Sequence, residues 1–297
     1  MSGSERATHF GLILPNYGEG LSLDLLRDSA TAAEQTDFDS LWATDHVMVT
    51  SVHAPIYGNI TEALVTLGYL AALTERVSLG VSALIVPMRN PFVVLKQLTS
   101  LDYLSGGRVV TAVAAGWMDD EFVSLGADFD RRGRALDDWL DMASSVFAQM
   151  PGQVRHDGNP RIADGWMAPD LVRPGGPELW VAGVSDATIR RAARTGVWHP
   201  VAQTPKQLRP MADEFKVQRP DGRIVLRINV IFADEPDAGT DERGRHAISG
   251  PDDHIEGELR TYLDAGCDGF VLNFSKDEPG LADRVRRFGE SLIPRFA

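Results

Sequence analysis

An aspartate and a histidine stand side by side at the end of a short apolar run, in the sequence Thr44-Asp45-His46. Imidazole changes its charge near neutral pH, and burial or a neighbouring carboxylate tunes it for proton transfer. The pair therefore suits general acid or base chemistry, with His46 as the proton carrier. The structural alternative is that Asp45 caps a turn through its backbone while His46 is simply packed, and spacing alone leaves both open.

Three carboxylates, Asp119, Asp120 and Glu121, follow Gly116-Trp117 just before helix-like sequence. Carboxylates are favourable near the positive end of a helix dipole, and this structural role accounts for two of the three. Glu121 is the candidate for proton transfer. Gly116 lacks a Cβ and Trp117 offers an aromatic face, so the pair suits a flat ligand, with a core or rim tryptophan as the alternative.

Two further segments could hold parts of a cofactor. Gly183-Val184-Ser185 closes an apolar run and opens a helix, where free amides and the helix dipole favour an anionic group. Ser185 as a helix cap is compatible with that role. Ser82-Ala83-Leu84 are small or apolar residues within a strand, against which a planar ring could lie, although an ordinary buried strand is the better explanation from these residues alone.

Several other chemistries are disfavoured. The segment at Ser185 lacks a P-loop ending, and no Gly-x-Gly-x-x-Gly follows the first strand. The seven histidines are scattered, so we expect no metal site. The single cysteine, Cys267, is expected at the start of the last strand, the wrong end for a nucleophile.

Composition restricts the class of protein. The chain has 297 residues, of which 43% are hydrophobic and 24% charged, enough for a sizeable globular core. Its net charge of -13 argues against nucleic acid and anionic membranes as partners and leaves small molecules. Its one cysteine and the absence of a long apolar run lead us to expect a cytoplasmic protein.

Short apolar runs alternate with amphipathic segments along the whole chain, which is typical of repeated strand-helix units. The expected strands are residues 9–14, 39–43, 77–86, 108–115, 178–183, 197–201, 223–233 and 267–274. The expected helices between them are residues 21–35, 61–74, 91–104, 134–147, 186–194 and 206–215, with one more after each of the last two strands. This count favours a single (β/α)8 TIM barrel over residues 1–297, with insertion loops at its C-terminal mouth.

Three stretches exceed the usual length of a connection: residues 46–60, 151–177 and 234–253. Long loops in compact domains are often lids or binding loops, and a solvated insertion is the alternative. All three stretches are therefore lid candidates, the insertion at about 151–177 among them, and the sequence does not distinguish between them.

Several segments together resemble the luciferase-like superfamily of flavin- and F420-dependent oxidoreductases. The resemblance runs nearly end to end and rests on FGLILP, FDSLWATDH, RVSLGVSALIVPMRNPFVVLKQLTSLDYLSGGRV, GWMDDEF, RRGRALDDWL, PELWVAGVSDATIRRAARTGVWHP and AGCDGFVLNF. It implies a (β/α)8 barrel and, by analogy, a homodimer.

The resemblance also implies roles for the candidate residues. The cofactor ring would lie against a bulge in the third strand that carries a non-prolyl cis peptide, matched here by Ala83-Leu84. Asp45 and His46 would lie near the ring, with Asp45 orienting the imidazole or helping to bind the ring. Glu121 resembles a proton-transferring carboxylate of some members, and the amides of residues 183–185 would hold the cofactor phosphate.

The Thr-Asp-His ending is more similar to the F420 enzymes than to luciferases, so the resemblance favours coenzyme F420 over FMN. The acidic tail of F420 requires a basic patch, for which the candidates are Arg161, Arg173, Arg190, Arg191 and Lys206. The chain lacks a tryptophan soon after His46 and has a shorter loop after Pro87 than F420-dependent glucose-6-phosphate dehydrogenases, so sugar phosphate is disfavoured.

The primary hypothesis is therefore hydride transfer between F420 and an organic substrate. A reduced-FMN-dependent monooxygenase of the same superfamily and a non-catalytic flavin-binding relative are the alternatives. The substrate itself cannot be read from the loops.

Overall fold

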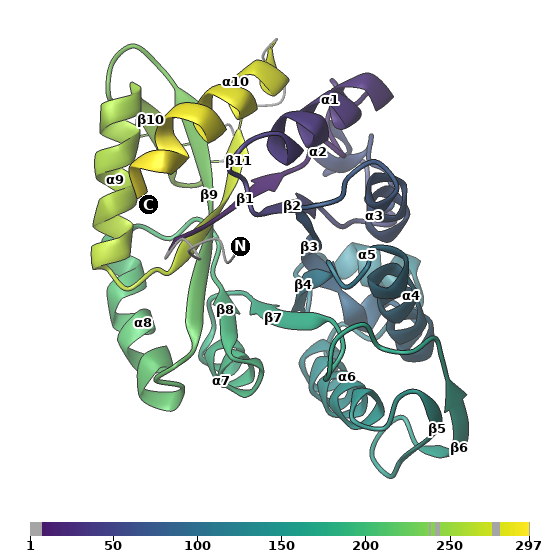
Figure 1. Ribbon diagram of the computed structural model, residues 1–297. Coiled ribbons are helices and arrows are strands. Elements are labelled where there is room, and N and C mark those ends of the chain that lie inside the picture. The colour runs from purple at the N-terminus through teal and green to yellow at the C-terminus, as the bar shows by residue number, and fades with distance from the viewer. Residues whose placement is uncertain (1–7, 238, 241–243, 275–279, 297) are drawn as a thin grey trace, which may run out of the picture. The chain divides into compact units, whose positions relative to one another are not determined.

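The computed structural model describes residues 8–237, 239–240, 244–274 and 280–296. Strands and helices alternate along them in the order of a (β/α)8 barrel (Figure 1). The chain divides into two compact units: unit 1 comprises residues 1–15, 22–42 and 180–297, and unit 2 comprises residues 16–21 and 43–179. Within the described ranges, no helix is both long and apolar enough to cross a membrane.

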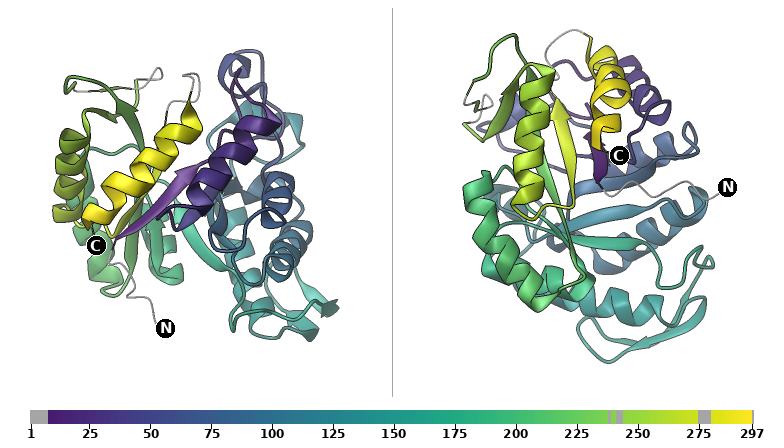
Figure 2. Two further views of the ribbon diagram at one scale, coloured as in Figure 1. Left: turned by 45° about the horizontal axis from the view of Figure 1, so that its top comes forward. Right: turned by 60° about the vertical axis from the view of Figure 1, so that its left-hand side comes forward.

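Unit 1 contains a parallel sheet in the order β10-β9-β11-β1-β2, and β8 pairs with both β7 and β9. Helices α1 and α10 lie side by side in both views of Figure 2. The strands are β1 (His9–Ile13), β2 (Ser40–Ala43), β7 (Glu178–Ala182), β8 (Val197–His199), β9 (Arg223–Phe232), β10 (Ala247–Gly250) and β11 (Gly269–Phe274); the helices are α1 (Leu23–Glu34), α7 (Asp186–Thr195), α8 (Pro205–Gln218), α9 (Asp252–Asp264) and α10 (Leu281–Arg287).

Unit 2 contains the parallel pair β3 and β4, with α3 and α4 packed beside each other. Asn90 caps α4 by accepting from the amides of Phe92 and Val93, and Pro91 starts the helix where no amide hydrogen is needed. The elements are α2 (Ala54–Tyr57), α3 (Ala63–Ala71), β3 (Ser78–Ile85), the short 3-10 turn η1 (Val86–Met88), α4 (Pro91–Leu104), β4 (Val110–Ala114), α5 (Asp119–Ser124), α6 (Arg132–Phe147), β5 (Gly152–His156) and β6 (Ile162–Met167).

The stretch 234–253, expected as a loop, contains a strand instead. β10 pairs in parallel with the last four residues of β9, and α9 begins at Asp252. Strand β9 continues beyond the end of β8, so its remaining backbone groups need another partner, and β10 provides it. The four residues of β10 are too few to give a periodic signal in the sequence.

The stretch 151–177 contains the antiparallel hairpin β5-β6, which packs on α6. It is tied to α4 by hydrogen bonds from Lys96 to the Ala168 carbonyl and by the ion pair between Arg173 and the buried Asp102. The segment connects a helix to the next strand, so it does not belong to the loops that follow strands. Of the three long stretches, those at 46–60 and 234–253 do follow strands.

Aromatic rings fill the inner face of unit 1. The Trp42 and Trp180 rings lie 4.6 Å apart, and His199 stacks on Trp42 at 5.6 Å. A Cβ at Gly11 would stand 2.5 Å from the indole nitrogen of Trp42, so only glycine fits there. The His199 Nδ1 lies 2.6 Å from the carbonyl oxygen of Val225, and burial lowers the pKa of His199 to about 3. This imidazole is therefore neutral and part of the core.

Candidate functional site

Asp45 follows the end of β2 and is completely buried. Its Oδ2 accepts from the Ile85 amide at 2.9 Å and from the Arg89 guanidinium at 2.9 Å, and its Oδ1 accepts from Arg89 at 2.6 Å. Burial is the largest influence on this carboxyl and raises its pKa, while Arg89 opposes that rise. Asp45 thus fastens the end of β2 to the end of β3 rather than orienting the adjacent imidazole.

The imidazole of His46 is oriented by Glu121. Its Nδ1 lies 2.8 Å from Oε2 of Glu121, whose Oε1 accepts from the amides of Val47 at 2.6 Å and Met48 at 3.1 Å. Burial tends to raise the pKa of Glu121, but the bonds from His46 and the two amides outweigh it and leave the pKa below its ordinary value. The ionised carboxylate needs donors, so Nδ1 carries the hydrogen.

This tautomer leaves Nε2 of His46 for another molecule. Among the described residues, Glu121 is the only hydrogen-bond partner of the imidazole. The ring of Tyr57 covers the imidazole at 4.2 Å, and Trp117 meets it edge-on at 6.1 Å. The imidazole of His46 can take a proton at Nε2 while Glu121 stabilises the resulting positive charge.

Strand β3 has the irregularity that the resemblance implied, one bond earlier than expected. The non-prolyl cis peptide joins Ser82 to Ala83, not Ala83 to Leu84, and the register with β4 shifts between Ser82 and Leu84. Ser82 and Leu84 are buried, whereas Ala83 is partly exposed between them. The bulge accordingly leaves one small side chain partly exposed between two buried ones.

Gly116 and Trp117 follow β4. Gly116 has a φ of 92°, and a Cβ there would lie 2.7 Å from both Ile85 and Phe122, so glycine is required by backbone and space alike. Trp117 is 57% exposed, and its ring contacts are with His46 and His53. Its indole therefore faces the segment after β2.

The segment Gly183-Val184-Ser185 lies in unit 1. Ser185 caps α7, its hydroxyl accepting from the Thr188 amide at 3.2 Å and lying 3.0 Å from the Thr188 hydroxyl. Gly183 has a φ of 128°, and its carbonyl accepts from the Trp198 indole at 2.8 Å. The expected helix start is present, with hydroxyl groups and first-turn amides that suit an anion.

Sequence reasoning missed Arg89 and a cavity of about 400 Å³ in unit 2. The cavity begins beside η1, three residues after Ala83, and three arginines line it: Arg89, Arg131 and Arg134. The guanidinium of Arg131 has no hydrogen-bond or ion-pair partner among the described residues, although its backbone amide donates to Asp128. The RRGR run was the available signal, but only the fold brings it next to the end of β3.

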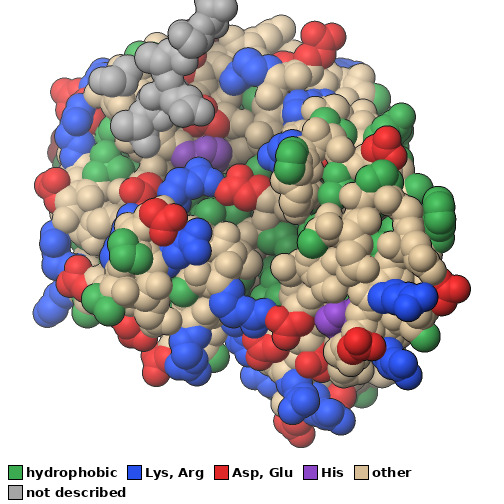
Figure 3. Space-filling model, turned by 60° about the horizontal axis from the view of Figure 1, so that its bottom comes forward, with side chains coloured by type: hydrophobic (Ala, Val, Ile, Leu, Met, Phe, Trp, Pro, Cys, Tyr) green, Lys and Arg blue, Asp and Glu red, His purple; other side chains and the backbone are tan. Residues whose placement is uncertain are grey.

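The basic residues expected to form a patch do not gather in that cavity. Arg173 forms an ion pair with Asp102 and donates a hydrogen bond to the Val109 carbonyl. Arg161 lies near Asp157 in the hairpin. Arg190, Arg191 and Lys206 belong to α7 and α8 of unit 1. On the face drawn in Figure 3, basic and acidic side chains lie interspersed.

The thiol of Cys267 and possible metal ligands were the remaining candidates for a functional site. Cys267 is buried, and burial raises the pKa of its thiol far above the usual range. Among the residues that the structure describes, no three histidine, cysteine, aspartate or glutamate side chains come together as metal ligands.

Sequence comparisons identify relatives. A family model described as luciferase-like monooxygenase matches residues 8–286. An uncharacterized protein of Mycobacterium tuberculosis is 25% identical over 201 residues, which are 63% of this chain and 70% of that protein. The alkanal monooxygenase alpha chain of a Kryptophanaron alfredi symbiont is 24% identical over 170 residues, 56% of this chain and 44% of that one.

Solved structures share the fold. Monooxygenase RslO1 from Streptomyces bottropensis superposes with a TM-score of 0.81 at 19% identity, covering 98% of this chain and 100% of that one. The coenzyme F420 dependent tetrahydromethanopterin reductase from Methanopyrus kandleri superposes with a TM-score of 0.79 at 14% identity. The superposition covers 98% of this chain and 99% of that one. The fold is thus the (β/α)8 barrel.

Proposed function

Because this chain belongs to the luciferase-like monooxygenase family, we propose that it is an oxidoreductase that transfers hydride between coenzyme F420 and an organic substrate. The observation that carries the proposal is the buried pair of His46 and Glu121 beside the end of β2. A hydride transfer to a carbonyl carbon, or from the carbon of an alcohol, needs a proton delivered to or removed from the oxygen on that carbon, and this pair is built to move one.

The residues of unit 2 fit a flat cofactor ring. Ala83 is the partly exposed residue of a bulge whose neighbours Ser82 and Leu84 are buried, and Gly116 after β4 lets the backbone pass close to Ile85 and Phe122 beside it. We assign the ring to this surface. The segment Gly183-Val184-Ser185 is assigned to the cofactor phosphate through the Val184 and Ser185 amides and the Ser185 hydroxyl, since the Gly183 amide donates to the His199 carbonyl.

The preference for F420 rests on two features. Structures whose names state F420 dependence share the fold, and Arg131 and Arg134 line a cavity together with Asp128 and Asp138; the guanidinium of Arg131, which is not paired with either aspartate, suits an acidic group such as those of the F420 tail. Bound F420 supplies or accepts the hydride at C5 of its ring. The remaining steps belong to the protein: Nε2 of His46 gives a proton to the substrate oxygen or removes one, and Glu121 stabilises the imidazolium form.

The second candidate is a monooxygenase that uses reduced FMN and oxygen, favoured by the likeness to RslO1 and to the alkanal monooxygenase alpha chain. A non-catalytic flavin-binding relative is the third.

Titration of the purified protein with F420 and with FMN, followed by cofactor absorbance, tests all three. We expect saturable binding of F420 and oxygen-independent oxidation of its reduced form by a substrate panel. Preferential FMN binding with oxygen consumption, or binding without any turnover, would contradict the proposal.

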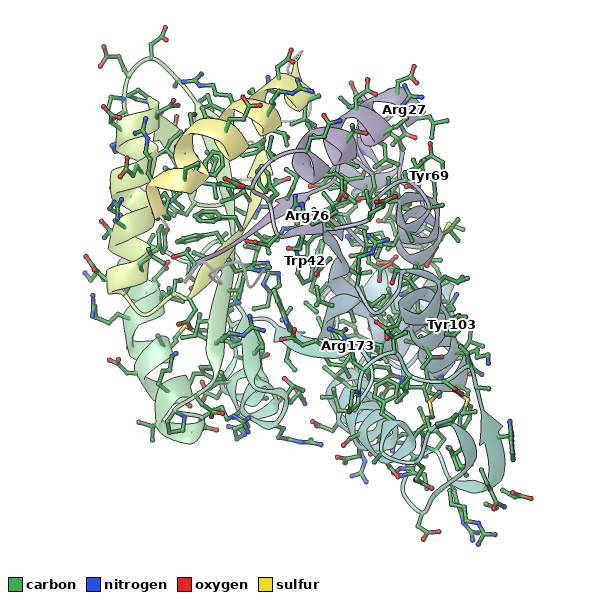
Figure 4. The ribbon with its side chains drawn as sticks, in the orientation of Figure 1. Arg27, Trp42, Tyr69, Arg76, Tyr103 and Arg173 are labelled. Atoms are coloured by element: carbon green, nitrogen blue, oxygen red, sulfur yellow. The ribbon has the colours of Figure 1, made fainter. Side chains whose placement is uncertain are left out.

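We further propose that the chain forms a homodimer through the outer face of α3 and α4. Helix α3 contains no charged residue, and seven large apolar side chains on this face are exposed, from 38% for Tyr69 to 75% for Leu104. The others are Val65, Leu73, Phe92, Val93 and Tyr103. Figure 4 shows Tyr69 and Tyr103 on the outer side of their helices.

The size of this face suits a second copy. At about 150–250 Å² per side chain, the exposed fractions amount to on the order of 700 Å², close to the ~800 Å² that each partner buries in a standard interface. A helix that is apolar on its outer side as well as its inner side is normally covered. An identical apolar face avoids the charge repulsion that other surfaces of a chain with net charge -13 would meet.

A further inference from the structure

The segment after β2 has an unusual composition for this chain. Residues 47–61 contain no aspartate, glutamate, lysine or arginine, although 24% of the whole chain is charged. Three of its apolar side chains are strongly exposed: Val47 at 44%, Met48 at 57% and Val52 at 77%. Exposed apolar side chains gathered beside a functional group are characteristic of ligand surfaces.

The segment is folded, so it displays these side chains in fixed positions. The Thr50 carbonyl accepts from the amides of His53 and Ala54, and the turn continues into α2. Its far end is tied to residues 16–18, since the Gly18 amide donates to Asn59 and the Thr61 amide to Asn16. A Cβ at Gly58 would stand 2.6 Å from the Ala54 carbonyl, so the tight return depends on glycine.

Aromatic rings join this segment to the proton carrier. Tyr57 packs at 4.2 Å on the imidazole of His46, and Trp117 meets His53 at 5.2 Å and is itself 57% exposed. A molecule that reaches Nε2 of His46 therefore passes aromatic and aliphatic surface. The charged side chains nearest in sequence to Trp117 are the exposed Asp119 and Asp120, which repel anions.

We propose that this apolar surface, formed by Val47, Met48, Val52, Tyr57 and Trp117, binds the substrate, and that the substrate is an uncharged organic molecule with a flat apolar ring system. This inference rests on the proposed oxidoreductase function. It specifies what that function leaves open, because the oxygen that gains or loses the proton is then that of a carbonyl or of a hydroxyl group on an otherwise apolar molecule. Carboxylated and phosphorylated substrates are disfavoured, since none of the five side chains of this surface is cationic, and the Arg132 guanidinium beside Gly116 is already engaged by the Gly116 and Phe129 carbonyls.

The test measures binding without turnover. Equilibrium dialysis of the full-length protein, with and without F420, is carried out with 2-acetylnaphthalene, with 6-acetyl-2-naphthoate and with a naphthyl ketone carrying a trimethylammonium group. We expect saturable binding of the neutral ketone, at least tenfold tighter than that of either charged counterpart. No saturable binding of the neutral ketone, or equal binding of the three, would overturn the inference.

Two matched substitutions locate the site. Val52→Asp is expected to weaken binding of the neutral ketone at least tenfold, whereas Val217→Asp on α8, at an equally exposed valine, leaves it unchanged. Val52→Lys should instead improve binding of the naphthoate, which a general loss of folding would not do. If Val52→Asp and Val217→Asp behave alike, the surface is not the binding site.

The two proposals fail separately. Because dialysis needs no redox step, a protein that binds the neutral ketone but does not oxidise reduced F420 disproves the cofactor assignment and keeps the substrate surface. A protein that turns over reduced F420 while binding the three probes equally supports the cofactor assignment and disproves the substrate surface.

Discussion

Nδ1 of His46 lies 2.8 Å from Oε2 of Glu121, and both side chains are almost completely buried. The same carboxylate also accepts from the amides of Val47 and Met48. One acidic group therefore fixes the tautomer of the imidazole, its direction and the turn that carries it. This arrangement has consequences that can be measured.

Replacing the imidazole should separate turnover from binding. We expect His46→Ala to lower kcat by about 10²- to 10⁴-fold, the usual contribution of a positioned acid or base, because the substrate oxygen loses its proton source. F420 affinity, measured by absorbance titration, should change little. Val123→Ala on α5, at an exposed position, serves as the control. Unchanged kcat in His46→Ala would remove the imidazole from the mechanism.

The buried ion pair of Asp45 and Arg89 should be sensitive to the loss of one partner. Arg89→Ala leaves a carboxylate without its cation in a site with no exposure, and such losses cost about 3–5 kcal/mol. Urea denaturation measures the free energy of unfolding. The exposed Arg27→Ala on α1 is the comparison, with an expected cost below about 1 kcal/mol. Equal costs for the two variants would show that the pair does not hold the ends of β2 and β3.

His199 should make stability depend on pH. Its pKa is about 3 in the folded protein, below the 6.5 of the free side chain, so only the unfolded chain binds the proton between these values. Stability is therefore full above pH 6.5 and falls as the pH drops towards 3, by up to on the order of 4–5 kcal/mol.

The pH effect can be assigned by substitution. His199→Phe keeps a ring beside Trp42 but removes the titrating group, so it should be less stable at pH 8, where the Val225 carbonyl loses its donor, and less dependent on pH from 8 to 4.5. His254→Gln on α9 should keep the wild-type slope. Parallel curves for wild type and His199→Phe would contradict this assignment.

Charges on the outer face of α3 and α4 should prevent dimerisation. We expect the wild-type protein to sediment as a dimer and Tyr69→Glu combined with Tyr103→Glu to sediment as a monomer, because each subunit would then bury two carboxylates against apolar surface. Val217→Glu, on α8, should remain dimeric. A monomeric wild-type protein at micromolar concentration would remove the proposal.

The sequence predicted most of the barrel because its strands are long apolar runs separated by amphipathic helices. Residues 9–14 and 91–104 were expected as a strand and a helix, and they form β1 and α4. Strand β10 and the hairpin β5-β6 were not expected. The first is four residues long, and the second consists of exposed and partly exposed residues around a single buried one, Val154, so it has no apolar face.

The candidate site was predicted in part. Asp45, His46 and Glu121 were identified because their types and their places after strands suit proton transfer. Their partnership was not, because Glu121 lies 75 positions from His46 and Arg89 lies 44 from Asp45, distances at which spacing predicts no contact. The position of the cis peptide at Ser82–Ala83 depends on the register between β3 and β4, which only the folded pair sets.

The adjacent residues Asp45 and His46 are each held by an element other than the segment that follows them: Asp45 by Arg89, and His46 by Glu121. From residues 47 and 48 only backbone amides take part. Apart from Tyr57, whose ring packs on the imidazole, the side chains of that segment are thus free to diverge without displacing His46. In this architecture new specificities can evolve by point changes or by exchange of a short peptide, while the proton-transfer apparatus is inherited intact.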